Sequence, residues 1–386
     1  MGSILNFVFP YPKNQIFDWC ITGPITTYIE SNYKHSYNLE IDDSCKNILV
    51  FETVEKFKGF TKNINTKINN QQTVIEYIKE NSSLIILVVS IADPAVDYEK
   101  QDIIDIVENE KLSDRVFYIE SNFQHLGHKN TFCWHFFIED AAENVSHIFL
   151  NEVNDLGYKS EEIDLEELNR FRNKKFISLN RTVDRIHRLS LLYDYLHEDF
   201  SSSYFSFLVY NSQYESILHF EPGEFDTTYF YQFLPIELDT HNLEDKQNFR
   251  TANALGKKEY YLNSCINLVT ETSFGQNELF LSEKILKPIL NYQPFIVLGP
   301  YHYLKELKRL GFKTFSDFWS EEYDEYEDAS ERYFKTMEVV KFLNSKSIEE
   351  LNELYQKCKD ICIFNRNHFL NIKFSLNEFI KKLEFE

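Results

Sequence analysis

The chain has 386 residues, 43% hydrophobic and 16% aromatic, which is enough apolar material for two domains of ordinary size and too much for a largely disordered protein. Its 40 Lys and Arg residues against 61 Asp and Glu residues give a formal net charge of −21, and this charge argues against nucleic acid or an anionic membrane surface as a partner. An anionic ligand would therefore need a local group of cationic side chains.

The six cysteines are scattered and form no CxxC pair. Cys358 and Cys362 are one helical turn apart, which favours a packed or surface pair over a metal site. The N-terminus lacks the basic and apolar regions of a secretory signal, and no run approaches the roughly 20 apolar residues of a membrane span. These features predict a cytoplasmic protein without a transmembrane segment.

The N-terminal part alternates short apolar runs with a helix-like segment. Apolar runs of strand length lie at residues 4–9, 47–51, within 83–94 and at 115–119, and residues 72–80 have apolar side chains at helical spacing. Continuous apolar strands that do not alternate with polar residues are typical of a parallel sheet that is covered on both faces.

After a charged, helix-like connector at residues 159–174, the pattern restarts. We predict strands at residues 176–179, 204–210, 265–271 and 294–299, a loop at 180–184, helices at 185–197 and 282–291, an acidic solvated loop at 321–331, and C-terminal helices at 329–345 and 347–363. The predicted fold class is α/β, with two Rossmann-like domains facing a cleft and with C-terminal helices. The predicted domains are residues 1–165 and 166–386.

The first polar cluster at a predicted strand end combines Asn180 and Arg181 with Arg185, His187 and Arg188. Such a cationic group suits a phosphate at a helix N-terminus. A basic first turn opposes the helix dipole, which favours a bound anion. The alternative is that these side chains only form ion pairs within an acidic protein.

Two further clusters follow in the same half of the chain. Glu271 ends a strand and could accept hydrogen bonds from a ligand hydroxyl, or could cap a turn. Ser282 is predicted to cap the next helix, which begins with Glu283 and Lys284. Lys284 opposes the dipole unless it faces an anion, so the pair could meet a ribose and a diphosphate or form an ordinary ion pair.

Together the clusters predict a site for a nucleoside diphosphate. The sequence has neither a GxGxxG nor a Walker A loop, which argues against a dehydrogenase or a P-loop enzyme. It also lacks a DxD motif after an apolar strand, which could hold a divalent metal against a diphosphate. We therefore expect a site without a metal or a cofactor, in which side-chain cations neutralise the ligand.

The order VTET…LFLSEKILKPIL…QPFIVLGP…YLKELKRLGFKTFSDF…EEYD resembles the donor-binding half of GT-B glycosyltransferases. It is most similar to the α1,3-fucosyltransferase family and its bacterial and viral relatives. That family has a strand ending in Glu, a helix start of the Thr-Glu-Lys type and the run Pro-Val-Val-Leu-Gly-Pro. Here Glu271, Ser282, Glu283 and Lys284, and residues 294–300, match these features.

In the same resemblance, Asn180, Arg181 and Arg188 correspond to the segment whose arginine contacts the donor diphosphate. The similarity covers about residues 175–320, and the N-terminal half matches only in architecture. The chain departs from the family in having Ser282 in place of Thr and a longer, more aromatic segment after Gly311.

The resemblance implies an inverting, metal-independent transfer of a sugar from a nucleoside-diphosphate sugar to a glycan acceptor. It suggests GDP-fucose as the donor and a polysaccharide, glycolipid or glycoprotein chain as the acceptor. The N-terminal domain would then hold the acceptor, and one of its carboxylates would act as general base. Glu120, after the strand RVFYI, is the first candidate and Asp93 the second, although each could be purely structural.

Two other hypotheses stay open. A nucleotide- or sugar-binding protein of the same fold would keep the diphosphate cluster but lack a working base. A structural α/β protein would need neither Arg188 nor Lys284.

Overall fold

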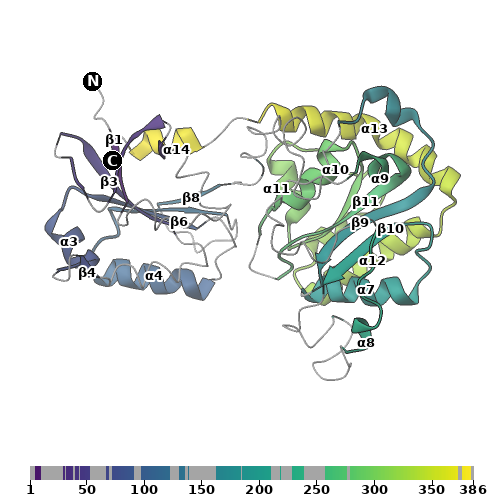
Figure 1. The fold of residues 1–386 in the computed structure, drawn as a ribbon, viewed down its shortest axis with the longest axis horizontal. Helices are drawn as coiled ribbons and strands as arrows, with labels where there is room; N and C mark the ends of the chain where they lie inside the picture. Colours follow the sequence, from purple (N-terminus) through teal and green to yellow (C-terminus); the bar gives the residue numbers. More distant parts are fainter. Residues whose placement is uncertain are drawn as a thin grey trace. The chain divides into compact units, whose positions relative to one another are not determined.

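A computed structural model defines the fold (Figure 1). It describes residues 5–9, 29–30, 32–37, 40–42, 44–52, 67–68, 72–90, 97–121, 130–134, 138, 162–183, 185–209, 218, 228–238, 257–275, 279–372 and 376–383. The chain divides into two compact units, residues 1–140 with 373–386 and residues 141–372. Each unit contains its own parallel sheet, which confirms the predicted α/β class; the cleft stays a prediction.

The first unit is built on a six-stranded sheet in the order β2-β1-β3-β6-β7-β8, and every neighbouring pair in it is parallel. Its strands are β1 (Leu5–Val8), β2 (Lys34–Ser36), β3 (Lys46–Glu52), β6 (Ile85–Ser90), β7 (Val116–Glu120) and β8 (Thr131–Cys133). Four of them, β1, β3, β6 and β7, coincide with the predicted apolar runs. The sequence analysis missed β2 and β8, which have only three residues each. A short antiparallel pair, β4 (Lys67–Ile68) with β5 (Gln72–Thr73), precedes α3.

Successive residues of each strand point to opposite sides of this sheet, and the side chains on both faces of its central strands are buried because helices cover each face. On one face, Val8, Leu49 and Val88 belong to a core that includes residues of α3 (Val74–Glu80) and α4 (Asp97–Asn109). Helix α3 begins at Val74, two residues after the start of the predicted segment 72–80, because Thr73 is its N-cap and forms a reciprocal capping box with Glu76.

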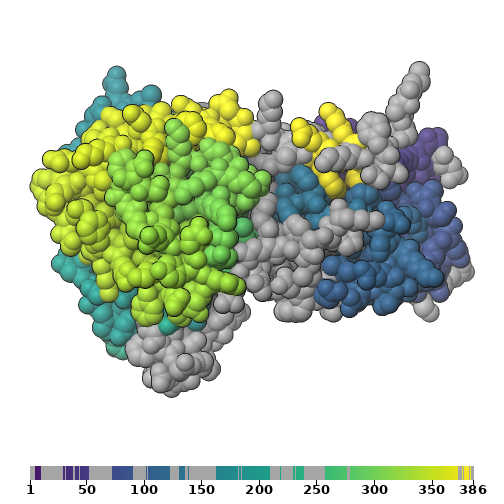
Figure 2. All heavy atoms as spheres, turned by 180° about the vertical axis from the view of Figure 1, so that it is seen from behind, coloured from purple at the N-terminus to yellow at the C-terminus, as the bar shows by residue number. Residues whose placement is uncertain are grey.

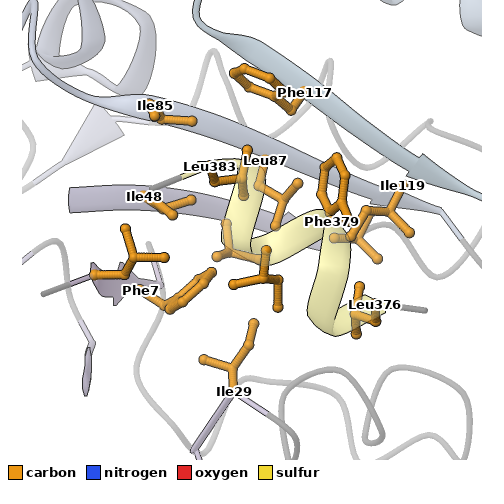
Figure 3. Close-up of a cluster of buried hydrophobic side chains, with 14 of the residues drawn as sticks. Phe7, Ile29, Ile48, Ile85, Leu87, Phe117, Ile119, Leu376, Phe379 and Leu383 are labelled. Carbon is orange, nitrogen blue, oxygen red and sulfur yellow. The ribbon is translucent and has the colours of Figure 1, made fainter. Parts of the chain in front are cut away.

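The other face is covered by α14 (Leu376–Leu383), a helix from the far end of the chain. Figure 3 shows Leu376, Phe379 and Leu383 of α14 turned toward strand side chains that include Phe7 and Leu87. The predicted division placed all C-terminal helices in the second domain, and the structure differs here: residues 373–386 return to the first unit. The physical reason is that the strands present apolar side chains on this face and need a second covering layer.

We expect Ile380→Ala to destabilise the first unit by about 2–3 kcal/mol, because this fully buried side chain (1% exposed) would leave a cavity in the core. The exposed Lys381 in the same helix provides the matched control, and Lys381→Ala should leave stability unchanged within about 0.5 kcal/mol. Hydrogen exchange of peptides from β3 and β6 measures the effect. Equal exchange in the two variants would show that α14 is not part of this core.

The second unit contains a four-stranded parallel sheet in the order β10-β9-β11-β12. Its strands are β9 (Lys174–Thr182), β10 (Tyr204–Val209), β11 (Ser264–Thr270) and β12 (Phe295–Leu298). All four were predicted, but β9 extends three residues beyond the predicted strand and includes residues 180–182, which the sequence analysis placed in a loop. This extension is possible because Asn180 finds hydrogen-bond partners inside the sheet.

The helices of the second unit include the predicted segments. They are α7 (Ile186–His197), α8 (Thr228–Tyr231), α9 (Lys258–Asn263), α10 (Leu286–Leu290), α11 (Tyr303–Arg309), α12 (Ala329–Asn344) and α13 (Ile348–Leu370), with short 3₁₀ turns η2 (Leu165–Asn169), η4 (Glu283–Ile285) and η5 (Glu322–Glu325). The sequence analysis missed α8 and α9. Figure 2 shows the green-to-yellow part of the chain, which includes α11 to α13, spread over one face of this unit. Cys358 and Cys362 are both buried in α13.

Two predictions for this unit are corrected. Within residues 159–174, the described part forms only the short turn η2 before β9, and not a connecting helix. The acidic segment 321–331 is partly ordered as η5 and α12, because Asp324 is buried and accepts hydrogen bonds from the backbone N–H groups of Leu304 and Lys305. None of the helices in the described ranges is both long and apolar enough to cross a membrane.

Candidate functional site

The candidate site lies where the strand order of the second sheet reverses. The chain passes from β9 to β10 on one side and then crosses to β11 and β12 on the other, so β9 and β11 are neighbours. In open parallel sheets, ligands bind outside the carboxyl ends of the strands at such a switch point. The residues after β9 and β11 include most of the side chains predicted to bind the donor.

Arg188 joins the ends of these two strands. It lies in the first turn of α7, and its guanidinium donates to the carbonyl oxygens of Glu271 (2.9 Å) and Thr270 (3.3 Å) and to the hydroxyl of Thr182 (3.3 Å). The side chain is only 6% exposed. The predicted phosphate-binding arginine therefore also holds β9 and β11 together at their carboxyl ends.

His187 supports the same carbonyl group. Its Nε2 lies 2.8 Å from the Glu271 carbonyl oxygen, and its ring stacks on Phe274 with centroids 4.8 Å apart. Burial lowers the pKa of His187 well below its ordinary value, and the charge of Arg188 lowers it further. The imidazole is therefore neutral, and we assign its Nε2–H as the donor to the carbonyl oxygen.

The carboxylate of Glu271 is fully buried and occupied by protein donors. Oε1 accepts from the hydroxyl of Tyr303 at 2.5 Å, and Oε2 accepts from the hydroxyl of Ser282 at 2.5 Å and from the backbone N–H of Thr272 at 3.0 Å. This corrects the expectation that Glu271 accepts from a ligand hydroxyl, because neither oxygen faces solvent. Glu271 instead fixes three segments that surround the site.

Ser282 caps the following helical segment as predicted, since its hydroxyl oxygen accepts from the backbone N–H of Lys284 at 3.3 Å. The same hydroxyl donates to Glu271. The start of η4 is thereby connected to the end of β11, and the backbone on which Lys284 stands is held in place.

The ammonium group of Lys284 is positioned by three oxygen atoms. It donates to Thr272 Oγ1 (2.8 Å), to Glu283 Oε1 (2.8 Å) and to Ser282 Oγ (3.3 Å). The side chains of Lys284 and Glu283 are 23% and 16% exposed. Burial by itself would raise the pKa of Glu283, but the charge and hydrogen bond of Lys284, together with a backbone hydrogen bond and the charge of Lys287, hold that pKa below the ordinary value. The pair is thus a fixed, charged and partly exposed group.

Lys287 adds a cation that the sequence analysis missed. It lies three residues after Lys284 and is the only polar residue of α10, where its four neighbours are buried. Burial lowers its pKa to about 8; Glu283 opposes this shift, and the positive charges of Lys284 and Arg188 add to it. The missed signal was a lysine inside the apolar run ILKPIL at one-turn spacing from Glu283 and Lys284.

Of the first cluster, Asn180 lies inside the sheet, and the side chain of Arg181 cannot be placed relative to the site. Asn180 is 2% exposed within β9, where it accepts from the hydroxyl of Thr270 (2.5 Å) and donates to Ser178 (3.1 Å). The amide therefore ties β9 to β11, and this corrects its assignment to a ligand-binding loop. Arg181 also belongs to β9, but its side chain lies outside the described residues.

The two candidate bases belong to the first unit. Glu120 is the last residue of β7, at the carboxyl edge of the sheet between β6 and β8, and is 1% exposed. It is therefore not at that sheet's own switch point, which lies between β1 and β3. Asp93 lies outside the described residues, so both assignments stay predictions.

A buried arginine from α12 stabilises the surrounding loops. Arg332 donates to the carbonyl oxygens of Gly299 (3.0 Å) and Phe274, which follow β12 and β11, and to that of Tyr326 (2.7 Å). Together with Tyr303 from α11, it fixes the turns at the carboxyl edge of the sheet. Sequence reasoning missed both residues, because their partners are distant along the chain.

The charges of the site differ in sign from those of the chain as a whole. Arg188, Lys284 and Lys287 contribute three positive charges, and those of Arg188 and Lys284 act on Lys287; the carboxylates of Glu283 and the buried Glu271 offset them in part. In a chain of net charge −21, this leaves a locally positive group at the switch point. Such a group can bind an anion with more than one negative charge.

Neither a protein-family model nor a curated protein sequence matches the chain. Two solved structures are similar to it. One is an α1,3-fucosyltransferase, with a TM-score of 0.43 and 8% identity over 100% of this chain and 91% of the other. The second is an α1,3-fucosyltransferase with GDP, with a TM-score of 0.40 and 9% identity over 97% of this chain and 92% of the other.

Proposed function

We propose that the chain is a glycosyltransferase that moves a sugar from a nucleoside-diphosphate sugar to a hydroxyl group of a glycan acceptor. The observation that carries this proposal is the locally positive group of Arg188, Lys284 and Lys287 at the switch point of the second sheet. A diphosphate matches that site in charge, and its position matches the usual ligand site of a parallel sheet.

Lys284 has the properties that departure of a diphosphate requires. When the bond between the sugar and the diphosphate breaks, negative charge grows on the leaving phosphate and oxocarbenium-like charge on the sugar. A cation that is already fixed at the phosphate stabilises this state without reorganising during the reaction. The contacts of Lys284 with Thr272, Glu283 and Ser282 provide that fixation. In this proposal the side-chain cations replace a metal ion.

The finer features of the proposal follow from the sequence resemblance. They are GDP-fucose as donor, inversion at the anomeric carbon, a polysaccharide, glycolipid or glycoprotein chain as acceptor, and a general base from the first unit. Glu120 is the first candidate for this base and Asp93 the second. For either residue, the test is loss of turnover with unchanged binding of the donor in the Asn or Gln variant.

The donor class can be tested by thermal unfolding of the whole chain with GDP, UDP, CMP and their sugars, each with and without EDTA. Ligand at 100 times its Kd stabilises the folded state by about 2.7 kcal/mol, which corresponds to a rise of about 5–10 °C for a domain of this size. We expect this rise with one nucleotide family, and the same rise in the presence of EDTA. The nucleotide family that raises the unfolding temperature identifies the nucleobase of the donor.

The other outcomes separate the remaining hypotheses. Absence of a shift with every nucleotide would overturn the proposal and favour a structural α/β protein. A shift that EDTA abolishes would overturn the metal-free part. Binding without release of nucleoside diphosphate from any donor, with a panel of glycan acceptors present, would favour a non-catalytic binding protein.

A further inference from the structure

We propose that Lys287 is a second anion-binding lysine of this site, which contacts one phosphate group of a diphosphate while Lys284 contacts the other. That the ligand is a nucleotide rests on the proposed function. That Lys287 binds a diphosphate group does not, and inorganic pyrophosphate can test it separately. It goes beyond the resemblance to fucosyltransferases, whose matching residues in this helical segment are Ser282, Glu283 and Lys284 and do not include Lys287.

The helical geometry places the two lysines together. Lys284 belongs to η4 and Lys287 to α10, which follows without interruption, so residues three and four apart lie on one face. Glu283 and Lys287 are four residues apart on the same face, and the charge of each acts on the other. Lys287 is partly exposed, whereas Leu286 and Pro288 on either side of it are buried.

The two lysines differ in their partners. Lys284 donates to three oxygen atoms. Lys287 makes no side-chain hydrogen bond or ion pair with any other residue in the described part of the chain, although it lies among apolar residues. Glu283 supplies a nearby opposite charge but no hydrogen bond, and a partly desolvated ammonium group without a hydrogen-bond acceptor is costly. A bound phosphate oxygen would offset that cost.

The charges that act on Lys287 are net positive, which favours a bound anion. They come from η4, which carries Glu283 and Lys284, and from α7, which carries Arg188. Helix α13 also packs against α10, but the charges that act on Lys287 are those of η4 and α7. The site as a whole holds three cations against the carboxylates of Glu283 and the buried Glu271, and the remaining positive charge favours the more negative ligand, a diphosphate over a monophosphate.

This arrangement predicts how affinity depends on pH. The pKa of Lys287 is lowered to about 8 without a ligand, chiefly by burial, so at pH 7 the ammonium is charged and ready to bind. Above pH 8 it is mostly neutral, and binding must first recruit a proton. Affinity for a nucleoside-diphosphate sugar should therefore fall about tenfold between pH 7 and pH 9. Lys287→Arg, which stays charged, should show a smaller decrease.

The experiment is calorimetric titration of the whole chain with the nucleoside diphosphate found by the thermal screen, the matching monophosphate, and inorganic pyrophosphate. Lys287→Met should weaken the diphosphate about 10- to 100-fold and the monophosphate by much less, whereas Lys284→Met should weaken both. Thermal unfolding provides the folding control, and we expect Lys287→Met to fold because it replaces a desolvated charge by an apolar side chain.

The outcomes distinguish this proposal from the proposed function. Equal affinity of wild type and Lys287→Met for the diphosphate, or equal losses for diphosphate and monophosphate, would overturn the role of Lys287 and leave the nucleotide site standing. Binding of pyrophosphate that depends on Lys287, without binding of any nucleotide, would support Lys287 and overturn the proposed function. Absence of binding by all three ligands would overturn both.

Discussion

Lys284→Met is expected to lower kcat/KM for the sugar donor by about 10²–10³-fold, the loss typical of removing one preorganised group that stabilises transition-state charge. The ammonium of Lys284 is held by Thr272, Glu283 and Ser282 before any ligand arrives. No reorganisation is then needed when charge develops on the leaving diphosphate. Most of the loss should appear in kcat, because the interaction strengthens as the bond breaks.

The measurement is release of nucleoside diphosphate from the donor by wild type and variant. Lys335→Met is the matched control, since Lys335 is an exposed lysine on α12 that pairs with Glu338 at 2.8 Å. Unchanged turnover in Lys284→Met, with a folded protein, would exclude the assigned role. A rise in KM alone would reduce Lys284 to a group that binds substrate and transition state equally.

Glu271→Ala is expected to destabilise the second unit by about 3–5 kcal/mol, because each buried donor left without its acceptor costs about 1–3 kcal/mol. The side chain is 0% exposed, and its oxygens accept from Tyr303, Ser282 and the backbone of Thr272. Alanine would leave two buried hydroxyl donors and the half-buried N–H of Thr272 without their acceptor and would create a cavity as well. Ser282 would lose its anchor, so affinity for the nucleotide should also fall.

Hydrogen exchange of peptides from β9, β11 and β12 in increasing urea measures this change within the second unit. Glu259 is the control carboxylate, because its side chain is 52% exposed and pairs with Arg170 at the surface; Glu259→Ala should cost less than about 1 kcal/mol. Glu271→Gln, which keeps the shape and one acceptor, should lie between the two. If Glu271→Ala and Glu259→Ala were equally stable, the network around Glu271 would have no structural role.

The sequence predicted the strands and helices well where hydrophobic pattern decides them. The apolar runs of β6 and β12 and the amphipathic spacing of α7 depend on local side chains and the polarity of neighbouring residues. It failed where a distant partner decides the local state. Residues 180–182 extend β9 because Asn180 bonds to Thr270, which is 90 residues away along the chain.

For the candidate site too, the sequence predicted features that depend on neighbouring residues and missed those that depend on distant ones. Ser282 as helix cap and the adjacent Glu283 and Lys284 could be read from the sequence, because a cap and its helix are a few residues apart. The sequence placed Glu271 correctly at the end of a strand, but the predicted partner was a ligand hydroxyl and the observed partners are protein groups. Its partner Tyr303 is 32 residues away, and its side-chain oxygens are filled from inside the protein. The sequence analysis overlooked Lys287, because its lowered pKa depends on burial and on nearby charges that only the folded structure brings together.

The sequence by itself determined the α/β class, the order of the strands along the chain and the segments rich in cations, since these depend on composition and short-range periodicity. Only the tertiary structure decided the order of strands in each sheet, the return of α14 to the first unit and the meeting of Arg188 with the end of β11, 83 residues later. The reason is physical: each of these features is stabilised by contacts between segments far apart in the chain, and no local pattern specifies which distant segment will supply the partner.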